Sequence, residues 1–334
     1  MRETRIPKGV GTIIDIAPIE DMQRPVWLML AENGDLFRVD VSSGVWAKLG
    51  AARPTMPKTR LHISRRGEFA AVVNDYGLHG QVIDLRSGIV TLELDGGDYL
   101  PRLVPFSFAF AELQGRTIAV HRTVWNRLDM SDASDGQLLS QRQREERSEH
   151  YLDYFHGALY VSPSGTRILD DGWVWHPVGM PVSWSLDRWL SQNPWESEDG
   201  PTRRVVCARE SYWDHAMTWV SEELVAIEGV DGVQIFDVTA AGPAGEGWRD
   251  DLPWARERIA FPGPAGRFFS SGQSLYSADA TGLSVWDPHT GARTAHVDAF
   301  QPTHRHPGSG QLVQLVDGTL IEGDLCELAR EGQN

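Results

Sequence analysis

Cysteine is scarce in this chain. Its 334 residues include only Cys207 and Cys326, which lie 119 positions apart. A disulfide framework or a cysteine-based metal site needs several cysteines at short, regular spacings. Two distant cysteines therefore exclude both kinds of site.

Long apolar runs are missing as well. A membrane-spanning helix needs about 18 or more consecutive apolar residues, and the sequence nowhere contains such a run. The first residues, Met1–Lys8, lack the apolar segment of a signal peptide. The sequence therefore predicts a cytoplasmic protein that does not enter a membrane.

Positive charge is in short supply. Lysine and arginine number 31 against 46 acidic residues, which gives a formal charge of -15. Binding to DNA, RNA or anionic lipid needs lysine and arginine to displace counterions, so this balance opposes it. The same charge speeds encounter with a basic partner. An acidic surface that only maintains solubility is the alternative interpretation.

Common catalytic motifs are absent too. The chain has no His-Glu-x-x-His pair, no Gly-x-Ser-x-Gly elbow and no Walker loop. Asp214 and His215 are adjacent, but neighbouring residues of a strand point to opposite faces. The sequence therefore assigns no catalytic residue, no metal ligand and no cofactor.

What the chain does contain is a repeat. The segment from Phe37 to Gly44 is the first of five related copies, and each copy carries an aspartate. These aspartates are 44, 45, 108 and 50 positions apart, and they are Asp40, Asp84, Asp129, Asp237 and Asp287. The gap of 108 equals about two repeats plus an insertion. A period of about 40 to 50 residues is typical of repeat architectures.

Each repeat unit contains short strands separated by turn residues. In the second unit, β-rich runs occupy 68–75, 81–85 and 89–94. Four antiparallel strands in about 45 residues is the content of one β-propeller blade. Val285-Trp286-Asp287 followed by Thr290-Gly291, together with the turn at 162–166, resembles the WD-repeat family. This resemblance implies a propeller that binds proteins, although only one copy has the Trp-Asp pair and none has the family's Gly-His pair.

The chain divides into about seven units, and a count of six or eight stays open. Their predicted bounds are 11–50, 61–97, 106–142, 150–209, 216–262, 266–299 and 302–328. The last unit has three clear strands, so we expect Thr4–Gly11 to supply the fourth and to close the ring. The predicted fold is all-β, with residues 1–334 forming one β-propeller domain that has an insertion at about 184–203.

Tryptophan is distributed unevenly along the chain. Seven of the 13 tryptophans fall between positions 173 and 219. Trp175 and Trp219 alternate as in a strand, and we expect them in the core. Insertions in repeat proteins often carry the binding site, and interfaces are enriched in tryptophan. We therefore predict a partner-binding surface that consists of Trp189, Trp195, Glu196, Glu198, Asp199 and Trp213.

Together these features predict a noncatalytic scaffold that binds a basic protein partner. A partner-neutralising role, such as that of an immunity protein against a basic toxin, would suit an acidic, compact chain. The alternative is a metal-dependent propeller hydrolase or lactonase with its site in the central channel. A sugar-binding propeller is a third possibility, because exposed tryptophans also stack on sugars.

Overall fold

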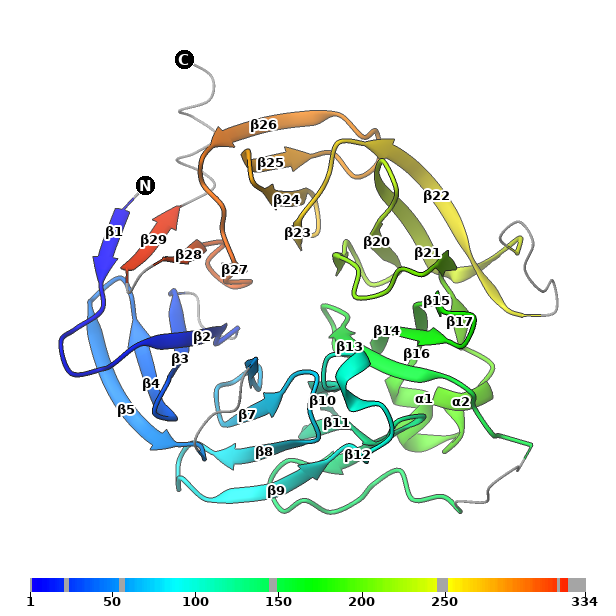
Figure 1. The fold of residues 1–334 in the computed structure, drawn as a ribbon, viewed down its shortest axis with the longest axis horizontal. Helices are drawn as coiled ribbons and strands as arrows, with labels where there is room; N and C mark the ends of the chain where they lie inside the picture. The colour runs from blue at the N-terminus through cyan, green and yellow to red at the C-terminus, as the bar shows by residue number, and fades with distance from the viewer. Residues whose placement is uncertain are drawn as a thin grey trace.

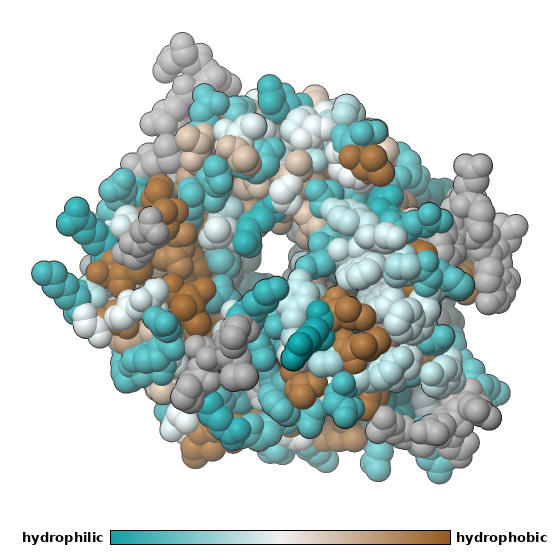
Figure 2. Space-filling model, viewed as in Figure 1, coloured by the Kyte–Doolittle hydropathy of each residue, from teal (hydrophilic) through white to brown (hydrophobic). Residues whose placement is uncertain are grey.

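The computed structural model describes residues 2–20, 24–53, 58–143, 149–244, 252–316 and 319–323. These residues form a ring of antiparallel sheets, and the chain travels once around it (Figure 1). Within the described residues the ring has seven blades, which confirms the predicted all-β propeller. Figure 2 shows an opening at the centre of the ring.

Three blades have the regular four-stranded form, with the first strand at the channel and the fourth at the rim (Figure 1). The first consists of β2 (Ile13–Pro18), β3 (Val26–Ala31), β4 (Asp35–Asp40) and β5 (Val45–Ala51). The second consists of β6 (Thr59–Ile63), β7 (Phe69–Asn74), β8 (His79–Asp84) and β9 (Val90–Asp95). The sixth consists of β23 (Arg267–Ser270), β24 (Leu275–Asp279), β25 (Gly282–Trp286) and β26 (Arg293–Asp298).

The third blade departs from the expected four strands. It follows a single 3-10 turn at Pro101–Leu103 and has only β10 (Phe108–Leu113), β11 (Arg116–Val124) and β12 (Arg127–Asp132). At its outer edge one isolated bridge pairs Ser131 with Leu138. The segment that would be a fourth strand instead runs toward the fourth blade, where Arg142 enters the core.

The fourth and fifth blades are joined in one ten-stranded sheet. The fourth blade contains β13 (Phe155–Val161), β14 (Arg167–Val174), β16 (Val182–Ser185) and β17 (Arg204–Val205), with the short ladder of β15 (Val178–Gly179) and β18 (Arg209–Glu210) beside it. The fifth contains β19 (Met217–Trp219), β20 (Leu224–Glu228), β21 (Gly232–Gly242) and β22 (Trp254–Pro262). A parallel pairing of Val205 with Trp254 links their outer strands.

The N-terminal strand closes the ring. The seventh blade has β27 (His304–Arg305), β28 (Leu312–Val316) and β29 (Thr319–Gly323), and β1 (Arg2–Arg5) adds to it with Thr4 opposite Leu320. This confirms the predicted closure, with the strand at Arg2–Arg5 rather than at Thr4–Gly11. The predicted end of this blade near Leu328, and Cys326, lie outside the described residues.

The repeated aspartates cap the hairpin between the third and fourth strands. Asp84 Oδ1 accepts the backbone N–H of Arg86 at 2.7 Å and that of Ser87 at 3.2 Å. Four residues on, Gly88 has φ 72° and donates its N–H to the Asp84 carbonyl at 2.7 Å. Glycine is needed there because a side chain disfavours this left-handed conformation.

In the third blade the aspartate that occupies this turn is Asp132. Its Oδ1 accepts the backbone N–H of Ser134 at 2.9 Å, and Gly136 has φ 74°. The predicted repeat position, Asp129, lies three residues earlier and is buried inside the blade. The repeat spacing therefore identified the right hairpin but assigned its turn to the wrong aspartate.

The hydrophobic core lies between neighbouring blades. Trp27 and Met29 of the first blade pack with Val313 and Leu320 of the seventh, and similar clusters join each other pair of neighbours. Such flat, interlocking contacts fix the ring as a rigid body. In the sixth blade Trp286 Nε1 donates to Ser277 Oγ at 2.9 Å, which joins the third strand of the blade to the second.

Helical structure is confined to short segments of the described chain. Besides the 3-10 turn, α1 (Leu186–Ser191) and α2 (Glu196–Asp199) lie between β16 and β17, where the insertion was predicted. No helix in the described part of the chain is long and apolar enough to cross a membrane.

Candidate functional site

The first helix of the insertion is packed against the fourth blade. Ser185 caps α1 by accepting the backbone N–H of Arg188 at 3.3 Å. Trp189 is buried, lies edge-on to Trp184 with ring centroids 6.0 Å apart, and donates its Nε1–H to the Pro194 carbonyl at 3.1 Å. Trp189 therefore anchors the insertion. The prediction that it belongs to a binding surface is wrong, because the side chain is buried.

Two predicted acidic residues of the surface are also buried. Glu198 pairs with the guanidinium of Arg142, whose Nη1 also lies 2.8 Å from Asp129 Oδ1. Glu196 accepts the backbone N–H of Thr202 at 2.9 Å and the side-chain amide of Asn193 at 3.0 Å. The prediction placed both carboxylates at the surface, but each satisfies internal donors. They hold the insertion onto the ring.

Trp195 and Asp199 lie nearer the surface. Trp195 is half-buried and stacks on His150 with ring centroids 4.3 Å apart and an interplanar angle of 13°. His150 Nδ1 lies 2.8 Å from Asp199 Oδ2, so one histidine joins the two residues. Trp213, the remaining predicted member, lies in a different place, among aromatic residues of other loops.

Four aromatic rings form a stacked column at the loop ends of the third to fifth blades. The order is Tyr99, Phe155, Trp173 and Trp213, with neighbouring centroids 5.8, 4.3 and 5.0 Å apart. The interplanar angles of 20°, 11° and 17° make the rings nearly parallel. Aromatic pairs contribute about 0.5–1.5 kcal/mol beyond burial, so the column fixes these loops to one another.

Two further tryptophans flank the column. Trp125 tilts against Phe155 at 4.5 Å, and Trp175 meets Trp173 edge-on at 5.0 Å. Tyr99 is 48 % exposed and Trp175 is 45 % exposed. The expectation that Trp175 lies in the core is therefore wrong, whereas Trp219 is buried as predicted. We refer to Tyr99, Trp125, Trp175 and Trp213 together as the aromatic surface.

The loops under the aromatic surface have strained backbones. Leu100, Ser211 and Asp214 have φ values of 48°, 53° and 63°, a region that residues with side chains rarely occupy. Trp213 Nε1 donates to the Leu103 carbonyl at 3.0 Å, and the Tyr76 hydroxyl donates to the Asp214 carboxylate. Strain of this kind persists where surrounding contacts enforce it, and it concentrates at functional sites.

A network of buried acidic and histidine side chains supports the same loops. His156 Nδ1 lies 2.5 Å from Asp170 Oδ2, and Asp171 accepts the backbone N–H of His215 at 2.6 Å. Burial raises the pKa of Asp171 well above the ordinary value and lowers the pKa of His215 to about 4. Both groups are thus favoured in their neutral forms. Both side chains are buried, and the bond from the His215 backbone to Asp171 fixes the loop at that position.

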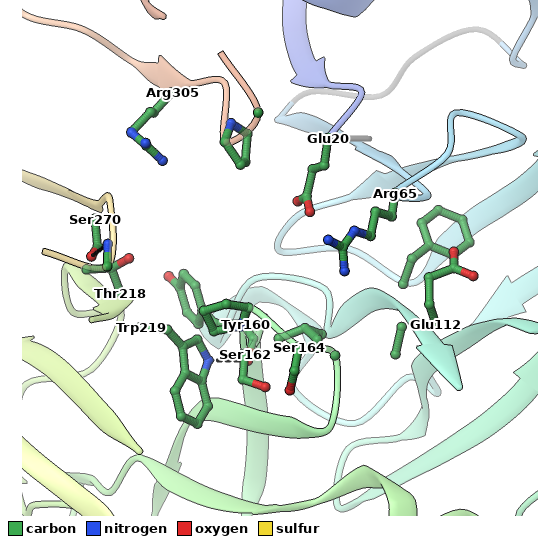
Figure 3. A pocket seen from close by; sticks show the side chains of 18 of the residues that line it. Glu20, Arg65, Glu112, Tyr160, Ser162, Ser164, Thr218, Trp219, Ser270 and Arg305 are labelled. Atoms are coloured by element: carbon green, nitrogen blue, oxygen red, sulfur yellow. Dashed lines mark hydrogen bonds between the residues drawn. The ribbon is translucent and has the colours of Figure 1, made fainter. Parts of the chain in front are cut away.

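Apart from the aromatic surface, the molecule has a cavity at a mouth of the central channel (Figure 3). The cavity has a volume of about 600 Å³ and is lined by residues of all seven blades. Its charged residues are Glu20, Arg65, Glu112 and Arg305. It lies where the innermost strands end, whereas the aromatic surface lies at the opposite end of the blades. Tyr99 and Trp213 are in the loops before β10 and β19, and Trp125 and Trp175 directly follow β11 and β14.

The described residues contain no group of three or more His, Cys, Asp or Glu side chains placed to hold a metal ion. In the segment His304–His306 the two histidines have separate partners. His304 Nε2 lies 3.4 Å from Asp15, and the buried His306 accepts the backbone N–H of Ser309 at 3.1 Å. The buried thiol of Cys207 has a pKa raised to about 12, so it is unreactive near neutrality.

Comparisons with known proteins identify the fold. No protein-family model matches the sequence, and a search of curated proteins finds no match. The chain is similar in structure to the Cps50 (Swd1) β-propeller domain of Myceliophteria thermophila, with a TM-score of 0.57 and 12 % identity over 96 % of this chain and 97 % of that one. It is also similar to a chain of a mitotic checkpoint complex, with a TM-score of 0.52 and 13 % identity over 96 % and 90 %. The chain therefore has a WD-repeat-like β-propeller fold.

Sequence reasoning missed most of the aromatic surface. Its members come from loops spread between positions 99 and 213, and each residue alone resembles an ordinary core aromatic. The excess of tryptophan between 173 and 219 was a usable signal, because Trp175 and Trp213 belong to that group. What the signal lacked was the fold, which brings Tyr99 and Trp125 beside them.

Proposed function

We propose that this protein is a noncatalytic scaffold that holds a protein partner on the aromatic surface. The observation that carries the proposal is the stacked column, with Tyr99 exposed at one end and the exposed Trp175 beside it. Rigid aromatic side chains lose little conformational entropy on binding, and tryptophan and tyrosine dominate interface hot spots. The likeness to a chain found in a checkpoint complex supports a role in a protein assembly.

The charge balance supports a basic partner. Asp98 and Asp214 are exposed and adjoin Tyr99 and Trp213 in sequence, while Arg102 is an exposed cation of the same segment. A formal charge of -15 on the whole chain adds a long-range attraction for cations. Lysine or arginine side chains of the partner would also stack favourably on exposed tryptophan rings.

A partner-neutralising role, as in an immunity protein, is the specific form that this binding would take if the partner is a basic toxin. It adds one requirement, namely that the bound partner loses its activity. Activity of the isolated partner with and without one equivalent of this chain tests that requirement separately from binding.

The first experiment is partner capture from the cells that make this protein. The tagged chain is compared with a double variant, Tyr99→Ser plus Trp175→Ser, after mild cross-linking. We expect the variant to recover far less partner, because it lacks both exposed aromatic side chains, Tyr99 and Trp175. Unfolding is monitored in parallel by circular dichroism.

The matched control is Val45→Ser plus Ile89→Ser. These side chains are 59 % and 63 % exposed, at the ends of the outer strands of the first two blades. The control removes comparable exposed apolar surface far from the aromatic loops. Equal recovery by both double variants would contradict the proposal.

A further inference from the structure

The mouth of the channel in Figure 3 contains a half-buried cation that has no counter-ion among the described residues. Arg305 lies at the end of β27, and Figure 3 shows its side chain directed into the cavity. Its guanidinium carbon lies 6.0 Å from the ring centre of Tyr276, which is a weak cation–π contact. Among the described residues, no ion pair or hydrogen bond engages the guanidinium, and its buried Nε lacks any acceptor.

Such a group is costly to bury. Removing a guanidinium from water without a compensating carboxylate or acceptor incurs a large desolvation penalty. Partial burial lowers the pKa of Arg305. A group in this condition is complemented by an anion that enters the cavity.

The wall around Arg305 can donate further hydrogen bonds. Figure 3 places Thr218 and Ser270 on the same side of the cavity as Arg305, at the ends of β19 and β23. The Thr218 hydroxyl can donate to an anionic oxygen, whereas the Ser270 hydroxyl already donates to the Val220 carbonyl at 3.5 Å. The guanidinium supplies the charge and a planar fork that matches a carboxylate or a phosphate.

The opposite wall limits what the ligand can be. Glu20, Arg65 and Glu112 lie there in Figure 3, so this side has mixed charge. The two carboxylates repel a ligand with many negative charges. A cavity of about 600 Å³ has the size of ordinary small-molecule sites.

We propose that this mouth of the channel binds a small polar molecule with a carboxylate or phosphate group, and that Arg305 holds its anionic end. The site is independent of the partner-binding surface, because it lies at the other end of the innermost strands. It gives the propeller a ligand that a bound protein does not displace.

The test is calorimetric titration of the full chain with three matched probes. Glycerol 3-phosphate and lactate carry the two anionic groups, and glycerol is the uncharged match. We expect saturable binding of at least one anion and none of glycerol. Absence of binding by both anions at millimolar concentration, or equal binding of glycerol, overturns the proposal.

The variant that assigns the site is Arg305→Gln. We expect anion affinity to fall by about tenfold or more, because a charge-assisted contact is lost. Arg102→Gln, an exposed arginine near the aromatic surface, is the matched control and should bind as the wild type does.

Two further measurements separate the possible failures. We expect Arg305→Gln to melt at or above the wild-type temperature without ligand, because it removes a half-buried charge that lacks a counter-ion. A clear loss of stability would assign Arg305 a structural role and overturn the proposal. Partner capture by this variant should be unchanged, so failure here leaves the scaffold proposal standing.

Discussion

Arg142 is the residue on which the insertion depends. Its guanidinium pairs with Asp129 in the third blade and Glu198 in α2, and it lies 5.4 Å from the ring centre of Trp195. Its Nη2 also donates to the Leu128 carbonyl at 2.8 Å. One buried side chain therefore joins the third blade to the insertion. Glu198 depends on it, whereas Asp129 also pairs with Arg127 at 2.9 Å.

Arg142→Ala tests this dependence. Removing one member of a buried ionic network leaves the others uncompensated, which typically costs about 3–5 kcal/mol. We expect a loss of that size in the free energy of unfolding, measured by urea denaturation. Arg24→Ala is the control, because its pair with Asp40 is largely exposed and should contribute about 1 kcal/mol or less. Similar losses in both variants would show that Arg142 is not an anchor.

Asp171 gives the stability of the protein a pH dependence. Burial raises the folded-state pKa above the ordinary 3.8, so folding favours the protonated acid. The contribution is fully present below pH 3.8 and is lost as pH rises through the folded pKa. Rising pH therefore lowers the stability of the loops that bear the aromatic surface.

Asp171→Asn should remove this dependence. Asparagine keeps an oxygen for the backbone N–H of His215 but cannot ionise. We expect the melting temperature of this variant to rise relative to that of the wild type as the pH increases above 3.8. Asp287→Asn is the contrast, because backbone hydrogen bonds lower the pKa of that exposed acid, and it should show no such gain. A constant difference across the pH range would refute the account.

At the scale of elements, the ring is held shut by β1. Four residues, Arg2–Arg5, pair with β29, and the Thr4 hydroxyl donates to Glu322 at 2.6 Å. Without β1, the outer edge of the seventh blade would expose unpaired backbone groups. The first and last strands of the chain therefore depend on each other.

Deleting residues 1–6 tests the closure. We expect a lower melting temperature and a tendency to self-associate through the freed edge of β29. Thermal melts followed by circular dichroism, with light scattering for association, measure both effects. Thr4→Ala is the control, since it removes one hydrogen bond and keeps the strand. A truncated chain with the same melting temperature as the full chain would contradict the role of β1 in closing the ring.

Elements that follow the repeat could be predicted from the sequence. The hairpin turns recur because Asp84 and Gly88, and their counterparts, satisfy the same local geometry in several blades. The missing fourth strand of the third blade could not be predicted in the same way. Its residues are diverted by Arg142, and the acid that attracts Arg142 lies 56 positions away at Glu198.

The candidate site was predictable only in part for a related reason. Acidic residues beside tryptophans in an insertion suggested a surface, and only the fold shows that Glu196 and Glu198 point inward. Burial depends on partners distant in sequence. The stacked column under the aromatic surface likewise exists only because the fold brings Tyr99, Trp173 and Trp213 together.

At the scale of the whole molecule, the two features lie at the two ends of the innermost strands. The aromatic surface lies at the end where these strands begin, and the cavity with Arg305 lies where they end. We propose that residues 1–334 form one domain, because hydrophobic clusters join each pair of neighbouring blades. One cooperative transition in the melts of the full chain is the expected result, and two separate transitions would oppose it.

The central claim is that the aromatic surface is where the partner binds. The most direct measurement is the dissociation constant of the captured partner for the wild type, for Tyr99→Ser plus Trp175→Ser, and for the Val45→Ser plus Ile89→Ser control. We predict that affinity falls by about a hundredfold or more in the aromatic variant, since hot-spot residues each contribute about 2 kcal/mol or more, and stays unchanged in the control. Undiminished affinity in a folded aromatic variant would contradict the claim.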